Sequence, residues 1–139
     1  MGLPAAAFWV LTALAKCMGH KAVRTKDTPG FLVNHAGRGL GSEGLRIVSE
    51  GIASFAEVDD ILRDGAGFRM GPFELMDLTG IDIGYFTKQA RYAETGDPKD
   101  APSRSVTELV EHGHLGRKSG RGWYVYDEQG NKTTTAGGT

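Results

Sequence analysis

Apolar residues recur at helical spacing along most of the chain. Residues 5–18 are the first such stretch, with Phe8, Leu11 and Leu14 on one face, and Gly19 follows where a glycine commonly ends a helix. Residues 21–25 instead alternate between polar and apolar side chains, which is typical of a short strand, and Pro29 breaks that pattern. Since no further strand lies nearby, we interpret residues 1–26 as the last helix and strand of a sheet whose other strands are missing.

Five more helices are predicted between residues 27 and 126. Their expected N-terminal positions are Phe31, Ser54, Pro72, Asp82 and Ser105. Their expected ends are glycines, namely Gly51, Gly65 or Gly67, Gly80, Gly96 and Gly113. The pattern therefore predicts an all-α domain, a bundle of about five helices. Residues 123–126 are expected to form a short extended hook, and the polar residues 127–139 a loose tail.

The segment Gly39–Gly44, GLGSEG, has the G-x-G-x-x-G spacing that can cradle a dinucleotide pyrophosphate. Such a site needs a buried strand before the first glycine and an acidic residue about 20 positions later, at the end of a second strand. Neither is present, so we place the segment inside a helix. Gly37, Gly41 and Gly44 then share one face, which either packs closely against another helix or opens a ligand cleft. Asn34 lies on the same face, and its amide could orient a ligand carbonyl or hydroxyl.

Composition and net charge indicate a globular protein of one domain, but they do not indicate which ligand it binds. A chain of 139 residues with 40% hydrophobic and 24% charged residues has room for one domain of ordinary size. The net charge of −1 argues against a general nucleic-acid binder. Cys17 is the only cysteine, so an intrachain disulfide is impossible, which suits the cytoplasm. The most apolar run, residues 4–14, is too short to span a bilayer. We expect a cytoplasmic protein with no membrane or nucleic-acid partner.

Candidate chemistry is sparse. No two histidines share a helix face at ligand spacing together with a third ligand, so no metal site is expected; they are His20, His35, His112 and His114. Five acidic residues are expected on solvated helix surfaces, namely Glu43, Asp59, Asp60, Glu74 and Asp77. A basic turn either holds phosphate groups or faces water; it contains Arg117, Lys118 and Arg121. No nucleophile with a neighbouring base can be nominated.

Three segments together resemble the C-terminal domain of the 3-hydroxyacyl-CoA dehydrogenases. They are KDTPGFLVNHAGRGLGSEGLRIVSEG, GAGFRMGPFELMDLTGID and GRKSGRGWYVYD, and the resemblance covers about residues 5–126. It implies that an N-terminal Rossmann domain, of which residues 1–26 are the end, binds NAD and carries the catalytic histidine. Residues 27–126 would close the acyl-CoA cleft and form a homodimer, in an enzyme of fatty acid β-oxidation. The chain alone would then bind no cofactor and be inactive.

The resemblance also implies site residues. Asn34 matches an asparagine that orients the thioester end of the substrate in a supporting catalytic role, and Phe68, Arg69 and Met70 match a segment that lines the acyl tail. Arg69 stands where relatives often have proline. It either points outward with its stem over Phe68 or pairs with a carboxylate at the end of an acyl chain, as in 3-hydroxyadipyl-CoA. The alternative function is a non-enzymatic helical self-association module. A dehydrogenase acting on a sugar acid shares the architecture but fits the second segment less well.

Overall fold

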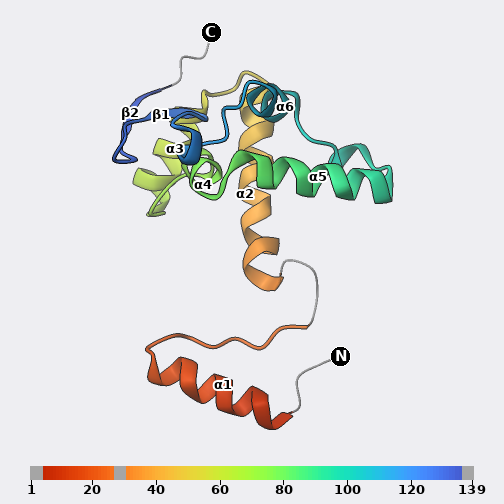
Figure 1. The fold of residues 1–139 in the computed structure, drawn as a ribbon, viewed down its shortest axis with the longest axis vertical. Helices are drawn as coiled ribbons and strands as arrows, with labels where there is room; N and C mark the ends of the chain where they lie inside the picture. The colour runs from red at the N-terminus through yellow and green to blue at the C-terminus, as the bar shows by residue number, and fades with distance from the viewer. Residues whose placement is uncertain (1–4, 27–30, 136–139) are drawn as a thin grey trace. The chain divides into compact units, whose positions relative to one another are not determined.

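The computed structural model describes residues 5–26 and 31–135, with the side chains of residues 6–26 and 37–133 (Figure 1). The chain divides into two compact units, Met1–Arg38 and Gly39–Thr139. The described residues form six α-helices and a sheet of two short strands. The predicted all-α class, with five helices following a first one, is therefore confirmed.

The first helix, α1, spans Ala5–Cys17 as the apolar pattern predicts. Gly19 follows its end with a left-handed φ of 76°, and the His20 amide donates to the carbonyl of Ala15 at 2.9 Å. The strand predicted at residues 21–25 is not formed here, where residues 20–26 belong to no helix or strand and are exposed. A strand is stabilised by hydrogen bonds to a neighbouring strand, and the described residues offer none here. The predicted break at residues 27–30 lies outside the described residues.

Helix α2, Phe31–Ser49, contains the glycine-rich segment in its interior, which confirms the helical interpretation of Gly39–Gly44. A Cβ atom added to Gly41 would lie 3.1 Å from Met76 Cε, and one added to Gly44 would lie 3.3 Å from the Phe73 ring. Both partners belong to helix α4. At these two positions the structure therefore supports close helix packing rather than a ligand cleft.

The next helices begin and end largely as predicted. Ser54 and Glu57 form the expected capping box, with the Glu57 carboxylate accepting from the Ser54 amide at 2.8 Å. Helix α3, Phe55–Asp60, runs into a π-helical turn, η1, Ile61–Gly65. Helix α4 spans Pro72–Thr79 and has proline in its first turn. Gly67, with φ of 72°, separates η1 from the segment that leads into α4.

Two predicted N-caps are wrong. Helix α5, Ile81–Thr95, begins one residue before Asp82, and α6, Arg104–Glu111, begins before Ser105. Asp82 instead accepts hydrogen bonds from the ammonium group of Lys118, 36 positions away. The N-cap of α6 is Ser103. The carboxylate of Asp82 has a tertiary partner, and the N-cap of α6 lies two residues before the predicted one, so the local pattern misplaced both helix starts. The short 3₁₀ turns η2, Pro98–Asp100, and η3, Arg117–Ser119, follow α5 and α6.

The predicted hook is strand β1, Tyr124–Tyr126, and it pairs antiparallel with β2, Lys132–Thr135. Residues 132–135 thus differ from the expected loose tail, and residues 136–139 lie outside the described residues. The turn is fixed by Asp127, whose carboxylate accepts from the amides of Gln129 at 3.0 Å and Asn131 at 2.8 Å.

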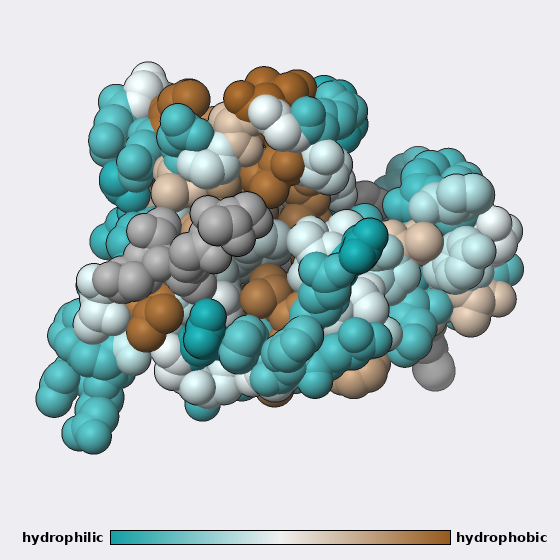
Figure 2. Space-filling view, turned by 90° about the horizontal axis from the view of Figure 1, so that it is seen from above, coloured by the Kyte–Doolittle hydropathy of each residue, from teal (hydrophilic) through white to brown (hydrophobic). Residues whose placement is uncertain are grey.

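An aromatic core joins α3, α4 and the hairpin, residues 123–135, which contains β1 and β2. The Phe73 and Trp123 ring centroids are 4.7 Å apart, and those of Phe55 and Tyr124 are 5.2 Å apart, both with edge-to-face geometry. The buried apolar residues are Phe55, Val58, Phe73, Ile81, Val106, Trp123, Tyr124 and Tyr126. On the face that Figure 2 shows, hydrophobic side chains form separate brown areas among hydrophilic ones.

Candidate functional site

The predicted site residues fall in two places. Asn34 lies in the first turns of α2, within the first unit, and its side chain is outside the described residues. Phe68, Arg69 and Met70 lie together between η1 and α4, in the second unit. The three acyl-tail candidates are consecutive in the sequence, and their role, like that of Asn34, stays a prediction.

The segment Phe68–Met70 presents two side chains outward. Phe68 is 44% exposed, Arg69 is exposed and Met70 is half-buried. The Phe68 amide donates to the carbonyl of Leu62 at 3.2 Å, which ties the start of the segment to η1. Within the described part of the chain, Arg69 has no ion pair. An apolar ring and a guanidinium are thus available together at the surface.

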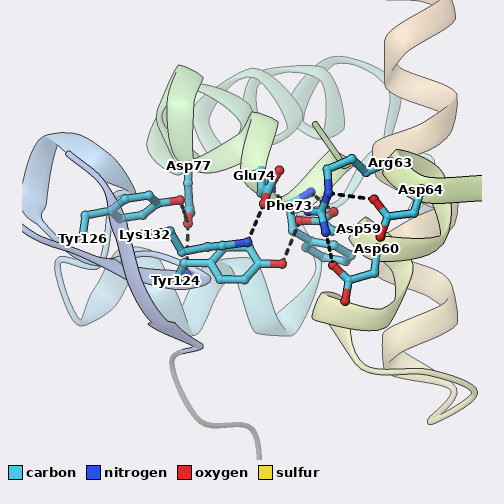
Figure 3. A network of polar contacts seen from close by, with 10 residues as sticks. All are labelled: Asp59, Asp60, Arg63, Asp64, Phe73, Glu74, Asp77, Tyr124, Tyr126 and Lys132. Carbon is cyan, nitrogen blue, oxygen red and sulfur yellow. Dashed lines mark hydrogen bonds and ion pairs between the residues drawn. The ribbon is translucent and has the colours of Figure 1, made fainter. Parts of the chain in front are cut away.

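The end of the segment is held by a buried carboxylate (Figure 3). Asp59 is 0% exposed. Its Oδ1 accepts from the Phe73 amide and its Oδ2 from the Glu74 amide, each at 2.9 Å, so the side chain of α3 caps the N-terminus of α4. The Tyr124 hydroxyl donates to Oδ2 as well, at 2.9 Å.

A second buried carboxylate repeats this arrangement at the other end of α4. Asp77, 1% exposed, accepts from the Trp123 amide and the Tyr124 amide, each at 3.0 Å. The Tyr126 hydroxyl donates to it at 2.8 Å. A Cβ atom on Gly122 would collide with this carboxylate, so the hairpin approaches α4 at a position that only glycine allows.

The expectation that five acidic residues face water is thus wrong for Asp59 and Asp77. It holds for Glu43 and Asp60, which are exposed, whereas Glu74 is largely buried and accepts from Lys132 at 2.6 Å. Each buried aspartate follows a buried phenylalanine by four residues, Phe55 or Phe73. That spacing places both carboxyl groups on the apolar face of their helix and could have identified them from the sequence.

Around the two carboxylates lies a shell of ion pairs. Arg63 contacts Asp60 at 2.6 Å and Glu74 at 3.3 Å. In the basic turn, the Arg117 guanidinium lies 5.3 Å from the centroid of the Tyr126 ring. Lys118 forms an ion pair with Asp82.

No set of three metal-ligating side chains is found among the described residues. Since the buried carboxylates cannot reach a ligand, the outward side chains of Phe68–Met70 are the candidate site here.

Comparison with known proteins identifies the family. A family model described as the C-terminal domain of 3-hydroxyacyl-CoA dehydrogenase matches residues 30–126. This chain belongs to that family. The match spans the start of α2 to the end of β1, so the family's domain contains all five helices from α2 to α6 and both buried aspartates. The resemblance seen in the three sequence segments is confirmed.

Similar proteins are dehydrogenases of acyl-CoA compounds. Human mitochondrial hydroxyacyl-coenzyme A dehydrogenase is 37% identical over 120 residues, which are 86% of this chain and 38% of the human protein. The 3-hydroxyadipyl-CoA dehydrogenase of Escherichia coli (strain K12) is 41% identical over 128 residues, 91% of this chain and 26% of that protein. The crystal structure of (S)-3-hydroxybutyryl-CoA dehydrogenase from Ralstonia eutropha superposes with a TM-score of 0.76 at 35% identity, covering 89% of this chain and 44% of that one. The chain spans less than half the length of these relatives.

In this member of the 3-hydroxyacyl-CoA dehydrogenase family, burial and the hydrogen bonds between the two aspartates and the two tyrosines shift the pKa values of all four side chains. Burial raises the pKa of the Asp59 and Asp77 carboxyl groups, while the hydrogen bonds they accept act in the opposite direction. Burial, together with the neighbouring carboxylates, raises the pKa of the Tyr124 and Tyr126 hydroxyls far above the ordinary value. The folded network therefore favours the protonated form of both phenols.

We expect Tyr124 and Tyr126 to resist ionisation until the second unit unfolds. Their pKa values are raised in the folded state, so the stabilisation is fully present below the ordinary tyrosine pKa of about 10 and is lost as the pH rises above it. An alkaline titration should follow tyrosinate absorbance and helical circular dichroism together. Tyr124→Phe and Tyr126→Phe should each remove one late-ionising group. Ionisation of both phenols near pH 10 with full helical signal would contradict the expectation.

Proposed function

We propose that this chain is the substrate-closing and dimerising domain of an NAD-dependent 3-hydroxyacyl-CoA dehydrogenase, which oxidises 3-hydroxyacyl-CoA to 3-oxoacyl-CoA in the cytoplasm. The observation that carries the proposal is the family match over residues 30–126. In the complete enzyme, Asn34 orients the thioester end of the substrate, and Phe68, Arg69 and Met70 contact the acyl tail. No helix among the described residues is long and apolar enough to cross a membrane.

The glycine-rich segment Gly39–Gly44 does not fit NAD. The G-x-G-x-x-G segment is in the interior of α2, where Gly41 and Gly44 are covered by Met76 and Phe73 of α4. A dinucleotide cradle needs the free backbone amides of a strand-to-helix turn, and a helix interior has none. We therefore assign NAD binding, with the catalytic histidine, to an N-terminal Rossmann domain.

Exposed apolar side chains support the proposed contacts with a Rossmann domain and with a second copy of the chain. Helix α1 exposes Trp9, Leu11 and Leu14, which is unusual for a helix of a soluble domain. In the second unit, Leu78 of α4 and Phe86 of α5 are about half exposed. Apolar surface of this kind favours association. We assign the surface of α1 to contact with the rest of the Rossmann domain, and that of α4 and α5 to contact with a second copy.

The proposal is tested by comparing the chain alone with a hybrid enzyme. The 139-residue chain alone should not oxidise NADH with acetoacetyl-CoA, since it encodes neither a cofactor fold nor a base. In the hybrid, residues 30–126 replace the matching part of the Ralstonia eutropha enzyme. NADH oxidation by the hybrid and not by the chain is the expected result.

Two controls complete that test. The Ralstonia eutropha enzyme truncated before the replaced part should be inactive, which shows that the hybrid's activity needs residues 30–126. Activity of the chain alone would overturn the assignment of the catalytic residues. A folded but inactive hybrid would favour the self-association module instead.

Arg69 offers a prediction about substrate choice. Its exposed position without an ion pair in the described residues agrees with an outward-facing side chain and also leaves it free to bind a carboxylate. If it binds the end of a dicarboxylic acyl chain, the Arg69→Pro hybrid should lose at least about tenfold in the ratio of kcat/KM for 3-hydroxyadipyl-CoA over 3-hydroxyhexanoyl-CoA, equivalent to about 1.4 kcal/mol. A ratio unchanged within about a factor of two, well below that tenfold, would assign Arg69 to solvent.

A further inference from the structure

The segment Phe68–Met70 is anchored on both sides. Before it, the left-handed Gly67 and the hydrogen bond from the Phe68 amide to Leu62 fix the backbone against η1. After it, Gly71 is buried and packs directly on Asp59: a Cβ atom on Gly71 would collide with the Asp59 carboxylate and with its Cα. Only three residues separate the two anchors, so a shift of either one has to move the side chains between them.

The second anchor depends on one carboxylate. Asp59 accepts from the first two free amides of α4, those of Phe73 and Glu74, because Pro72 has none to offer. Without this carboxylate those donors would be buried and unpaired, and the start of α4 would have to move to satisfy them. The Tyr124 hydroxyl holds the carboxylate from the side of the hairpin (Figure 3).

We propose that Asp59 is a positioning residue: by capping α4 and packing on Gly71, it sets the place of Phe68, Arg69 and Met70 and thereby the acyl chain that the enzyme accepts. This inference rests on the proposed function, which assigns that segment to the acyl tail. Asp59 itself touches no substrate, since it is fully buried. It acts through the segment that it holds.

The molecule supplies a matched control. Asp77 has the same exposure within 1%, accepts from two backbone amides and one tyrosine hydroxyl, and lies on the same aromatic core. Its amides come from the hairpin instead of the start of α4. Tyr124→Phe removes one hydrogen bond from Asp59, and Tyr126→Phe removes one from Asp77. Both changes keep the ring, so their effects on folding should be similar.

The first experiment measures amide hydrogen exchange in the 139-residue chain, under conditions where it stays folded. Tyr124→Phe should speed the exchange of the amides of residues 68–71, 73 and 74 by about tenfold through local opening. Tyr126→Phe should leave those amides unchanged. If both carboxylates only stabilise the fold, Tyr124→Phe and Tyr126→Phe should change the exchange rates of these amides equally. That result would overturn the inference.

The second experiment measures substrate choice in the hybrid enzyme. Tyr124→Phe should change the ratio of kcat/KM between 3-hydroxyhexanoyl-CoA and 3-hydroxybutyryl-CoA by about fivefold or more, a size set by apolar contacts to a few methylene groups. Tyr126→Phe should leave that ratio unchanged. Equal ratios in both variants, with an active parent hybrid, would refute the effect of Asp59 on substrate choice. An inactive parent hybrid would instead refute the proposed function, while the exchange experiment still decides whether Asp59 positions the segment.

Discussion

Replacing Asp77 by alanine is expected to lower the free energy of unfolding by about 3–5 kcal/mol. The substitution leaves three buried donors without an acceptor: the amides of Trp123 and Tyr124 and the hydroxyl of Tyr126. It also opens a cavity between α4 and the hairpin. Because the hairpin supplies three of the core aromatic residues, the loss should affect the whole second unit.

Urea unfolding followed by circular dichroism measures this effect. Asp60→Ala is the control: that aspartate is the last residue of α3, but its side chain is exposed and its carboxylate pairs with Arg63. Exposed ion pairs contribute little, so the control should unfold near the parent chain. Equal midpoints for the Asp77 variant and the parent would show that the buried network does not stabilise the fold.

Asn34→Ala in the hybrid enzyme is expected to lower kcat/KM by about 30-fold to 900-fold, or about 2–4 kcal/mol in the transition state. The prediction rests on the proposed function, in which the amide of Asn34 donates to the thioester carbonyl as charge develops on it. NAD affinity and the melting temperature should be unchanged, because the other domain binds the cofactor.

The matched variant is Asn34→Asp, which keeps the size of the side chain but removes the amide donor. It should be about as slow as the alanine variant if the donor is what matters. The contrasting role is that Asn34 only caps or links helices. A lower melting temperature with near-normal turnover in Asn34→Ala would establish that role and remove Asn34 from the site.

Local sequence determined where most helices begin and end. The Ser54–Glu57 capping box, the proline that opens α4 and the glycines after α1 and α5 act through hydrogen bonds and φ angles within a few residues. These interactions need no partner from elsewhere in the chain. For the same reason the sequence around the glycine-rich segment of α2, which lacks a preceding strand, was enough to distinguish it from a dinucleotide-binding motif. The family, too, was evident from three sequence segments, which the family match confirms.

Tertiary structure decided everything that depends on a distant partner. Residues 21–25 have the pattern of a strand but no neighbour to pair with among the residues that the structure describes, whereas β2 forms because β1 lies beside it. Asp82 lies in the first turn of α5, after the N-cap Gly80, and its carboxylate pairs with Lys118, 36 positions away. The clearest case is the pair Asp59 and Asp77, since a carboxylate favours water unless buried donors replace it. The spacing from Phe55 and Phe73 could mark both aspartates as facing the core, but their donors come from up to 65 positions away, and only the folded chain brings those donors to them.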